Sequence, residues 1–162
     1  LQPLIAAGKV EVMHEDWADD WKPENAKKII NAAITKHGQN FDAILASNDG
    51  TAGGAIQALT EEGIAGKVIV TGQDADLAAC QRIVQDTQTM TIYKPLHLLS
   101  KQAAALAVRL AQRRPIIARD VSANGQTDVP SVFLPIHSVT KDNLRDTVVK
   151  DGLVTEKDVF GR

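Results

Sequence analysis

Residues 41–54 read FDAILASNDGTAGG, and this stretch decides the fold class. Its first half, Phe41–Ser47, is a short apolar run of the length typical of a buried strand. The run of small and apolar residues that follows, Thr51–Glu62, predicts a helix that stops at Gly63. A strand that passes directly into a helix is the repeating unit of parallel α/β sheets, so this stretch favours that class.

The same alternation of strands and helices continues along the chain on both sides of this stretch. We expect further strands over Val10–Met13, Lys67–Thr71, Thr89–Tyr93 and Val132–Val139. We expect further helices over Pro23–His37, Ala75–Gln85, Pro95 to about Arg113, and Asp142–Lys150. Between them lies a turn-rich segment, 115–130, which contains the dipeptide Asn124-Gly125. The sequence therefore predicts an α/β fold with a parallel sheet flanked by helices on both faces.

Composition and charge fit a folded domain and exclude several classes of protein. The 162 residues are 44% hydrophobic and 23% charged, which is enough apolar surface for a buried core. A formal net charge of -2 and a pI of about 6.1 disfavour a nucleic-acid-binding surface. Cys80 is the only cysteine, which excludes an internal disulfide. Because the chain starts at Leu1 without a methionine, we expect a mature or trimmed part of a longer protein.

Four side chains suited to ligand binding follow four successive strands of the predicted sheet. They are Trp21, Asn48, Asp74 and Lys94. In parallel sheets, ligands bind beyond the carboxyl ends of the strands, and these ends share one edge. An indole offers a flat face to a ring, and a carboxylate, an amide and an ammonium group can hydrogen-bond hydroxyls. This inventory predicts a site for a neutral polyhydroxylated ligand, meaning a sugar.

Each of the four residues also has a purely structural interpretation. Trp21 could cover the first turn of the helix that follows it, and Lys94 could be a solvated loop lysine. Asn48, with Asp49, could serve only as a cap for the next helix, and Asp74 could cap the helix after its own strand. The binding hypothesis depends on four such residues at four successive strand ends.

Other chemistries find little support in the sequence. Gly50, Gly53 and Gly54 open a helix, but they match neither the dinucleotide-binding nor the Walker pattern. Close helix–sheet packing explains Gly53 and Gly54 better. The four histidines lack metal-ligand spacing, and no G-x-S-x-G elbow is present. Cys80 lies in a predicted helix and is best explained as a small buried hydrophobe. We therefore expect no enzyme, no cofactor and no metal site.

Several longer runs carry a resemblance that is more specific than any single motif. They are WADDWKPENA at 17–26, ASNDGTAGGAIQAL at 46–59, GQDADL at 72–77, TQTMTIYKP at 87–95, DVPS at 128–131 and DTVVKDG at 146–152. Together they resemble the type I periplasmic binding proteins of bacterial ABC sugar importers, and among these the receptors for D-xylose. The resemblance spans nearly the whole chain.

This resemblance implies a fold of two α/β lobes, each of flavodoxin-like topology, with the sugar in the cleft between them. It implies that Trp21 stacks on the sugar ring and that Asn48, Asp74 and Lys94 hydrogen-bond its hydroxyls. The family's other ligand residues lie on an N-terminal lobe that has no counterpart here. The chain is therefore expected to be the C-terminal portion of such a protein and to bind xylose weakly or not at all by itself.

The resemblance also implies the domain arrangement. Residues 1–94 are expected to form the C-terminal sugar-binding lobe, 95–114 a helix that crosses to the N-terminal lobe, and 115–162 a return segment that completes the C-terminal lobe. The crossing helix carries an apolar stripe that consists of Leu96, Leu99, Ala103, Leu106 and Leu110. Four exposed leucines favour association, because burial of one leucine contributes about 1.5–3 kcal/mol. We expect the stripe to dock on a second copy of the chain or on its own lobe.

The partners implied are D-xylose or a related aldose, the membrane subunits of an ABC permease, and the missing N-terminal lobe or a second copy, with no nucleic acid. The location implied is periplasmic or extracytoplasmic, with a signal peptide in the precursor and a lipoprotein tether as a variant.

The alternative hypothesis is the sugar-sensing domain of a transcriptional or two-component regulator. A third is an enzyme on a flavodoxin-like sheet, with Asp74 and Lys94 as its acid–base pair, and it has the least support because fold does not establish function.

Overall fold

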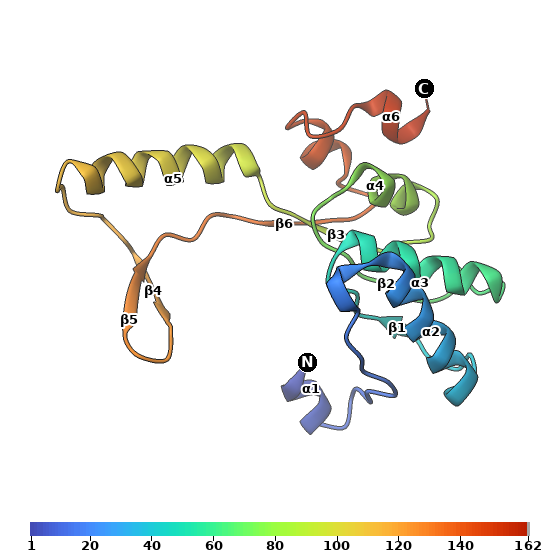
Figure 1. Ribbon diagram of the computed structural model, residues 1–162. Helices are drawn as coiled ribbons and strands as arrows, with labels where there is room; N and C mark the ends of the chain where they lie inside the picture. Colours follow the sequence, from blue (N-terminus) through green and yellow to red (C-terminus); the bar gives the residue numbers. More distant parts are fainter. Residues whose placement is uncertain (162) are drawn as a thin grey trace. The chain divides into compact units, whose positions relative to one another are not determined.

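The structure is a computed structural model that describes residues 1–161, and the chain divides into two compact units. The larger unit contains residues 1–92 and the C-terminal residues from Ser138 on, and the smaller unit contains residues 93–137. The smaller unit is therefore an insertion in the larger one along the chain (Figure 1).

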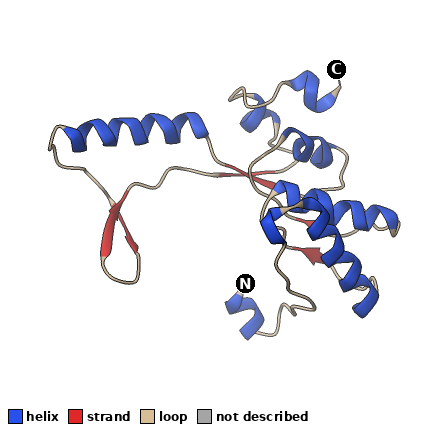
Figure 2. Cartoon of the chain, in the orientation of Figure 1, coloured by secondary structure: helices blue, strands red, loops and turns tan. Residues whose placement is uncertain are grey.

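The larger unit alternates helices with short strands, as Figure 2 shows. In chain order its elements are α1 (Gln2–Ala6), the 3₁₀ turn η1 (Asp19–Trp21), α2 (Pro23–His37), β1 (Ala43–Ile44), α3 (Asp49–Glu61), β2 (Ile69–Val70), α4 (Leu77–Val84), β3 (Thr91–Tyr93), β6 (His137–Val139), the π-helical turn η2 (Arg145–Val149) and α6 (Glu156–Phe160). The chain passes between the two units within β3 and within β6.

Pairing links the strands of this unit into a series. β1 and β2 are parallel neighbours, with Ile44 opposite Val70. Beyond β2, Gln73 forms a parallel bridge with Ile92 of β3, and β3 pairs in turn with β6. The segment that contains β2 therefore lies between β1 and β3, and helices connect these strands. The α/β class predicted from the sequence is confirmed.

Helices α2 and α3 pack against each other and cover β1 and β2. The core between these elements consists of Ala52, Ile56, Leu59, Val68 and Val70, with Ile30 and Ile34 of α2 packed against it. A Cβ atom at Gly54 would collide with the backbone carbonyl of Pro23 at the start of α2. Gly54 therefore permits close helix–helix packing, rather than the helix–sheet packing predicted, and Gly53 faces the guanidinium of Arg82.

Helix α4 packs against α6, which the sequence analysis did not predict. Ala79, Cys80 and Ile83 form the buried side of α4. The Gln81 side chain of α4 donates a 2.8 Å hydrogen bond to the carbonyl of Asp158 in α6. Thr155 caps α6 by accepting from the Asp158 amide, and Gly161 ends the helix in a left-handed conformation. These local signals for α6 were present in the sequence and were missed.

The predicted helices agree with the structure better than the predicted strands do. Helix α2 has the predicted bounds, with Pro23 at its first position and Gly38 at its end. By contrast, 10–13 forms no strand, and the runs 41–47 and 67–71 contribute only two paired residues each. The reason is that a strand is defined by pairing with a neighbour, and no strand pairs with 10–13.

Two further predictions near the C-terminus need correction. The predicted strand 132–139 is paired only over β6, and the predicted helix 142–150 contains the π-helical turn η2 instead of an α-helix. In this turn the amide of Lys150 donates to the carbonyl of Arg145, five residues earlier, at 3.0 Å. The Asn143 side chain bonds the amide of Thr140 and the carbonyl of Ser138, which replaces the first turn of a regular helix.

The smaller unit consists of helix α5 (Leu96–Ala111) and a hairpin of β4 (Asp120–Ala123) and β5 (Asp128–Ser131). Helix α5 was predicted, but only a turn-rich segment was predicted where the hairpin lies. Asn124 accepts hydrogen bonds from two amides of the hairpin loop, and Gly125 has a φ of 85°. The Asn-Gly dipeptide was therefore a usable hairpin signal.

Helix α5 starts after Pro95, as predicted, and none of its residues is buried. Leu96, Leu99 and Leu110 of its apolar stripe are exposed. Association through this stripe and the predicted domain bounds remain predictions. No helix within residues 1–161 has the length and apolar character needed to cross a membrane.

Candidate functional site

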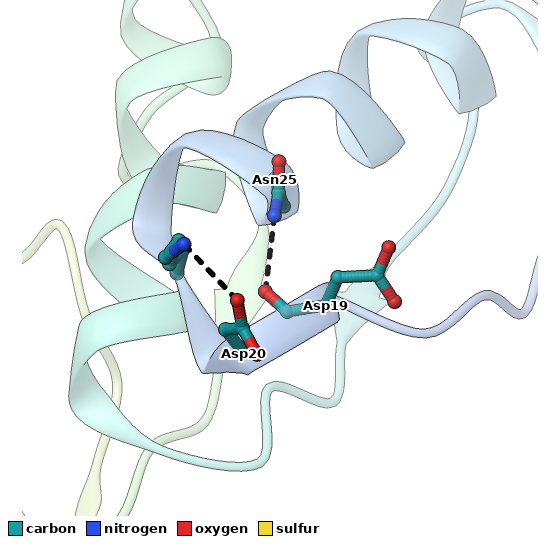
Figure 3. A network of polar contacts seen from close by, with 4 residues as sticks. Asp19, Asp20 and Asn25 are labelled. Carbon is teal, nitrogen blue, oxygen red and sulfur yellow. Dashed lines mark hydrogen bonds and ion pairs between the residues drawn. The ribbon is translucent and has the colours of Figure 1, made fainter.

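Trp21 lies at the end of η1, and Figure 3 shows its neighbours Asp19 and Asp20 beside Asn25 in the first turn of α2. The Asn25 side chain donates a 3.0 Å hydrogen bond to the carbonyl of Asp19, and Lys22 and Asp20 form an ion pair of 3.0 Å. The Trp21 side chain is 58% exposed, so it does not serve mainly to cover α2. Trp21 has a φ of 57° and Asp20 a φ of 55°, a conformation that bulky residues rarely adopt.

Asn48 is the N-cap of α3, so its structural interpretation holds in part. Its Oδ1 accepts from the amide of Thr51 at 2.8 Å and from the Thr51 hydroxyl at 2.7 Å. These bonds use the oxygen only. Its Nδ2 group makes no hydrogen bond to another residue of the part of the chain that the structure describes, so it remains available as a donor.

Asp74 does not cap α4, so that structural alternative is wrong. The N-cap of α4 is Asp76. Asp74 is exposed on the turn that follows β2, and its amide donates to the carbonyl of Ile92 at 2.9 Å. Asp74 and Ala75 have φ values of 103° and 58°, so this turn is a second place where non-glycine residues adopt a left-handed backbone.

Lys94 directly follows β3 and precedes Pro95, the N-cap of α5. It is half-buried rather than fully solvated, and it belongs to the smaller unit. The larger unit carries Trp21, Asn48 and Asp74 at the ends of η1, β1 and β2 along the chain. The roles of all four as ligand contacts remain predictions.

A buried polar network lies beside Asn48 and Asp74, and sequence reasoning missed it. Asp49 is only 1% exposed, although it directly follows Asn48. Its Oδ1 accepts from Gln88 at 2.9 Å, and its Oδ2 accepts from the hydroxyl of Thr91 at 2.9 Å. Arg82 donates to the carbonyl of Asp49 at 2.8 Å and to the Gln88 side chain at 2.9 Å. The network therefore joins α3, α4 and β3.

Burial controls the protonation of this network. Desolvation raises the pKa of Asp49, and the hydrogen bonds from Gln88, the Asp76 amide and Thr91 oppose that effect by stabilising the carboxylate. Desolvation likewise lowers the pKa of Arg82, and the charge of Asp49 opposes it. The sequence showed Asp49 only as a possible helix cap, because its partners lie far away along the chain.

A family model described as a periplasmic binding protein domain matches residues 2–115. The chain belongs to the periplasmic binding proteins. This assignment confirms the family resemblance inferred from the sequence motifs.

Similar proteins agree with this assignment. The periplasmic binding protein described here is 48% identical over 98% of its length to a D-xylose-binding periplasmic protein of Escherichia coli, and 48% identical over 99% to that of Haemophilus influenzae. It covers 48% of each, so it spans about half the length of these relatives.

Solved structures show the same fold. A carbohydrate transporter solute-binding protein from Chloroflexus aurantiacus, in complex with D-glucose, matches with a TM-score of 0.84 and 30% identity over 97% of this chain and 54% of that one. A solute-binding protein from Clostridium phytofermentans with bound β-D-glucose matches with a TM-score of 0.80 and 26% identity, over 98% of this chain and 52% of that one. The predicted type I lobe is thus confirmed.

Cys80 of this periplasmic binding protein is expected to be chemically inert. Its side chain has no exposed surface, and burial, with the charges of Asp49 and Asp76, raises the pKa of its thiol to about 11. At pH 8 only about one thiol in a thousand would be ionised, against roughly a quarter for an ordinary cysteine. Iodoacetamide should therefore label the native protein slowly and the urea-unfolded protein fast, as mass spectrometry can measure. Equal rates in the two states would contradict the burial of Cys80.

Proposed function

We propose that this chain is part of the substrate-binding component of an ABC-type monosaccharide importer and that its ligand is D-xylose or a related aldose. The observation that carries the proposal is 48% identity, over nearly the whole chain, to two D-xylose-binding periplasmic proteins. A periplasmic or extracytoplasmic location and delivery of the sugar to a membrane permease are parts of the same proposal.

The regulator hypothesis is not favoured. The transcriptional regulator GalR of Escherichia coli is 33% identical over only 66% of this chain, and the chain covers 29% of it. The identity to the xylose-binding proteins is higher and extends over nearly all of the chain. The two relatives at 48% identity are named as xylose-binding proteins, and reversible capture of a sugar needs no cofactor and no bond cleavage.

The proposed binding mode uses the four predicted site residues, of which Trp21 ends η1 and the other three follow β1, β2 and β3 along the chain. The exposed indole of Trp21 would stack on the C–H face of the sugar ring. The Asp74 carboxylate would accept from two adjacent hydroxyls, and the Asn48 Nδ2 and Lys94 Nζ groups would donate to others. Strained backbone often occurs at binding sites, and the left-handed conformations at Trp21 and Asp74 support a role for these two residues.

The remaining contacts are proposed to come from a second lobe. Because the chain spans about half the length of its relatives, we expect the chain alone to make only part of the contacts. Each loss of about 1.4 kcal/mol weakens binding tenfold. The isolated chain should therefore bind xylose far more weakly than a full-length protein that contains it.

Calorimetric titration tests the proposal. A full-length protein that contains these 162 residues is titrated with D-xylose, L-arabinose, D-ribose and D-glucose, and the isolated chain is titrated in parallel. We expect saturable binding with D-xylose preferred, and weak or unmeasurable heat from the chain alone. Failure of the folded full-length protein to bind any of the four sugars would refute the proposal.

A further inference from the structure

We propose that Asp49 is a positioning residue that holds the turn carrying Asp74 and fixes it beside Asn48. This inference rests on the proposed function, in which Asp74 and Asn48 contact the sugar. The turn consists of residues 73–76, between β2 and α4, and we call it the Asp74 turn.

The Asp74 turn has a conformation that its own residues do not favour. Asp74 and Ala75 both have positive φ values, 103° and 58°, and neither is glycine. Alanine has no side-chain group that could stabilise the left-handed conformation locally. A backbone of this kind persists only where the surrounding structure imposes it, so contacts outside the turn must hold it in place.

Three successive amides of the turn are tied to such contacts. The Asp74 amide donates to the carbonyl of Ile92 at 2.9 Å, and the Ala75 amide donates to the Thr91 hydroxyl at 3.2 Å. The Asp76 amide donates to Oδ2 of Asp49 at 3.0 Å. Because the Thr91 hydroxyl itself donates to the same Oδ2 at 2.9 Å, Asp49 controls two of the three bonds.

Asp49 is held from its other side, so it can act as a fixed anchor. Its own amide donates to the carbonyl of Gln73 at 2.9 Å, which ties the start of α3 to the start of the turn. Gln88 and Arg82 hold its Oδ1 and its carbonyl oxygen. Since Asn48 directly precedes Asp49, the same anchor fixes the positions of Asn48 and Asp74 relative to each other.

The network supplies only hydrogen-bond donors to the carboxylate oxygens of Asp49. Every group directed at the two carboxylate oxygens is a donor: the Gln88 amide, the Thr91 hydroxyl and the Asp76 backbone amide. An asparagine would replace one acceptor oxygen by an NH₂ group, which would oppose one of these donors. Asp49→Asn should therefore weaken the anchor of the Asp74 turn with almost no change in side-chain volume.

The test begins with sugar affinity in a full-length protein that contains this chain. We expect Asp49→Asn to weaken D-xylose binding about 10- to 100-fold, because the proposed charge-assisted bonds to Asp74 lose their geometry. The matched control, Asp42→Asn, makes the same change at an exposed aspartate of the same unit and should leave the affinity unchanged. Unchanged affinity in Asp49→Asn would overturn the proposal.

A second-site change separates positioning from general stability. Glycine adopts positive φ without strain, so Ala75→Gly should restore most of the lost affinity in the Asp49→Asn background. Ala79→Gly changes another buried alanine, within α4, and should not restore it. Equal effects of the two glycine substitutions would show that Asp49 acts only on stability. If Asp49→Asn does not fold, the variant Thr91→Val is used in its place. It removes the hydroxyl that links Asp49 to the Ala75 amide.

Amide hydrogen exchange tests the inference without any ligand. In the sugar-free protein, Asp49→Asn should speed exchange at Asp76, whose amide donates to Asp49, and at Ala75, whose acceptor Thr91 is itself held by Asp49, while amides in α2 keep their protection. Unchanged exchange at both positions would overturn the inference even if the protein binds xylose. If the wild-type protein binds no sugar, the proposed function fails, and this exchange result still decides whether Asp49 holds the turn.

Discussion

Gly72→Ala is expected to destabilise the larger unit by about 3 kcal/mol or more, because it breaks a buried hydrogen bond to a carboxylate. A Cβ atom built at Gly72 collides with Oδ1 of Asp49 and with Nε2 of Gln88, the two atoms that form this bond. Neither side chain can move outward without losing its other partners in the network. The alanine methyl group therefore leaves a buried charge with fewer donors, which is among the costliest changes in a protein interior.

Urea unfolding followed by circular dichroism measures this effect as a shift of the midpoint. Gly50→Ala is the matched control, since the nearest atom to its Cβ would be Nδ2 of Asn48 at an ordinary 3.6 Å. Gly50 lies within α3, where alanine is favoured over glycine by about 1 kcal/mol, so the control should be neutral or stabilising. A Gly72→Ala midpoint equal to that of the control would show that the network does not stabilise the fold.

Sequence patterns predicted α2, α3, α4 and α5 well because helix signals are local. Pro23 and Gly38 mark the two ends of α2, and both lie where these residues suit a helix start and stop. Strand signals are weaker, because pairing depends on residues elsewhere in the chain. Both 10–13 and 41–47 were predicted as strands, yet only the second pairs with a neighbour.

The same distinction applies to the candidate site. The predicted topology selected Trp21, Asn48, Asp74 and Lys94, because each follows the predicted end of a strand. It did not find the network around Asp49, whose partners Gln88 and Thr91 are 39 and 42 residues away in sequence. Nothing near Asp49 distinguishes a buried acceptor from a surface helix cap, so only the three-dimensional structure separates the two.

Asp74→Ala is expected to weaken D-xylose binding by a full-length protein at least 100-fold. In the proposed mode the carboxylate accepts two hydrogen bonds from neighbouring hydroxyls, and each charge-assisted bond contributes about 1.5–3 kcal/mol. Loss of both removes about 3 kcal/mol or more, which corresponds to roughly two decades in affinity. Asp74→Asn should have a smaller effect, because the amide keeps one acceptor and asparagine tolerates the positive φ of this position.

Asp76→Ala provides the matched control for this experiment. Asp76 is an exposed aspartate two residues away, and its side chain makes no capping hydrogen bond to α4. Removal of its carboxylate changes the local charge by the same amount while leaving the Asp76 amide bonded to Asp49. If Asp74→Ala and Asp76→Ala weaken binding equally, the effect is one of charge near the site, and Asp74 is not a direct ligand contact. A large loss confined to Asp74, graded from asparagine to alanine, is the pattern that only direct hydrogen bonds to the sugar produce.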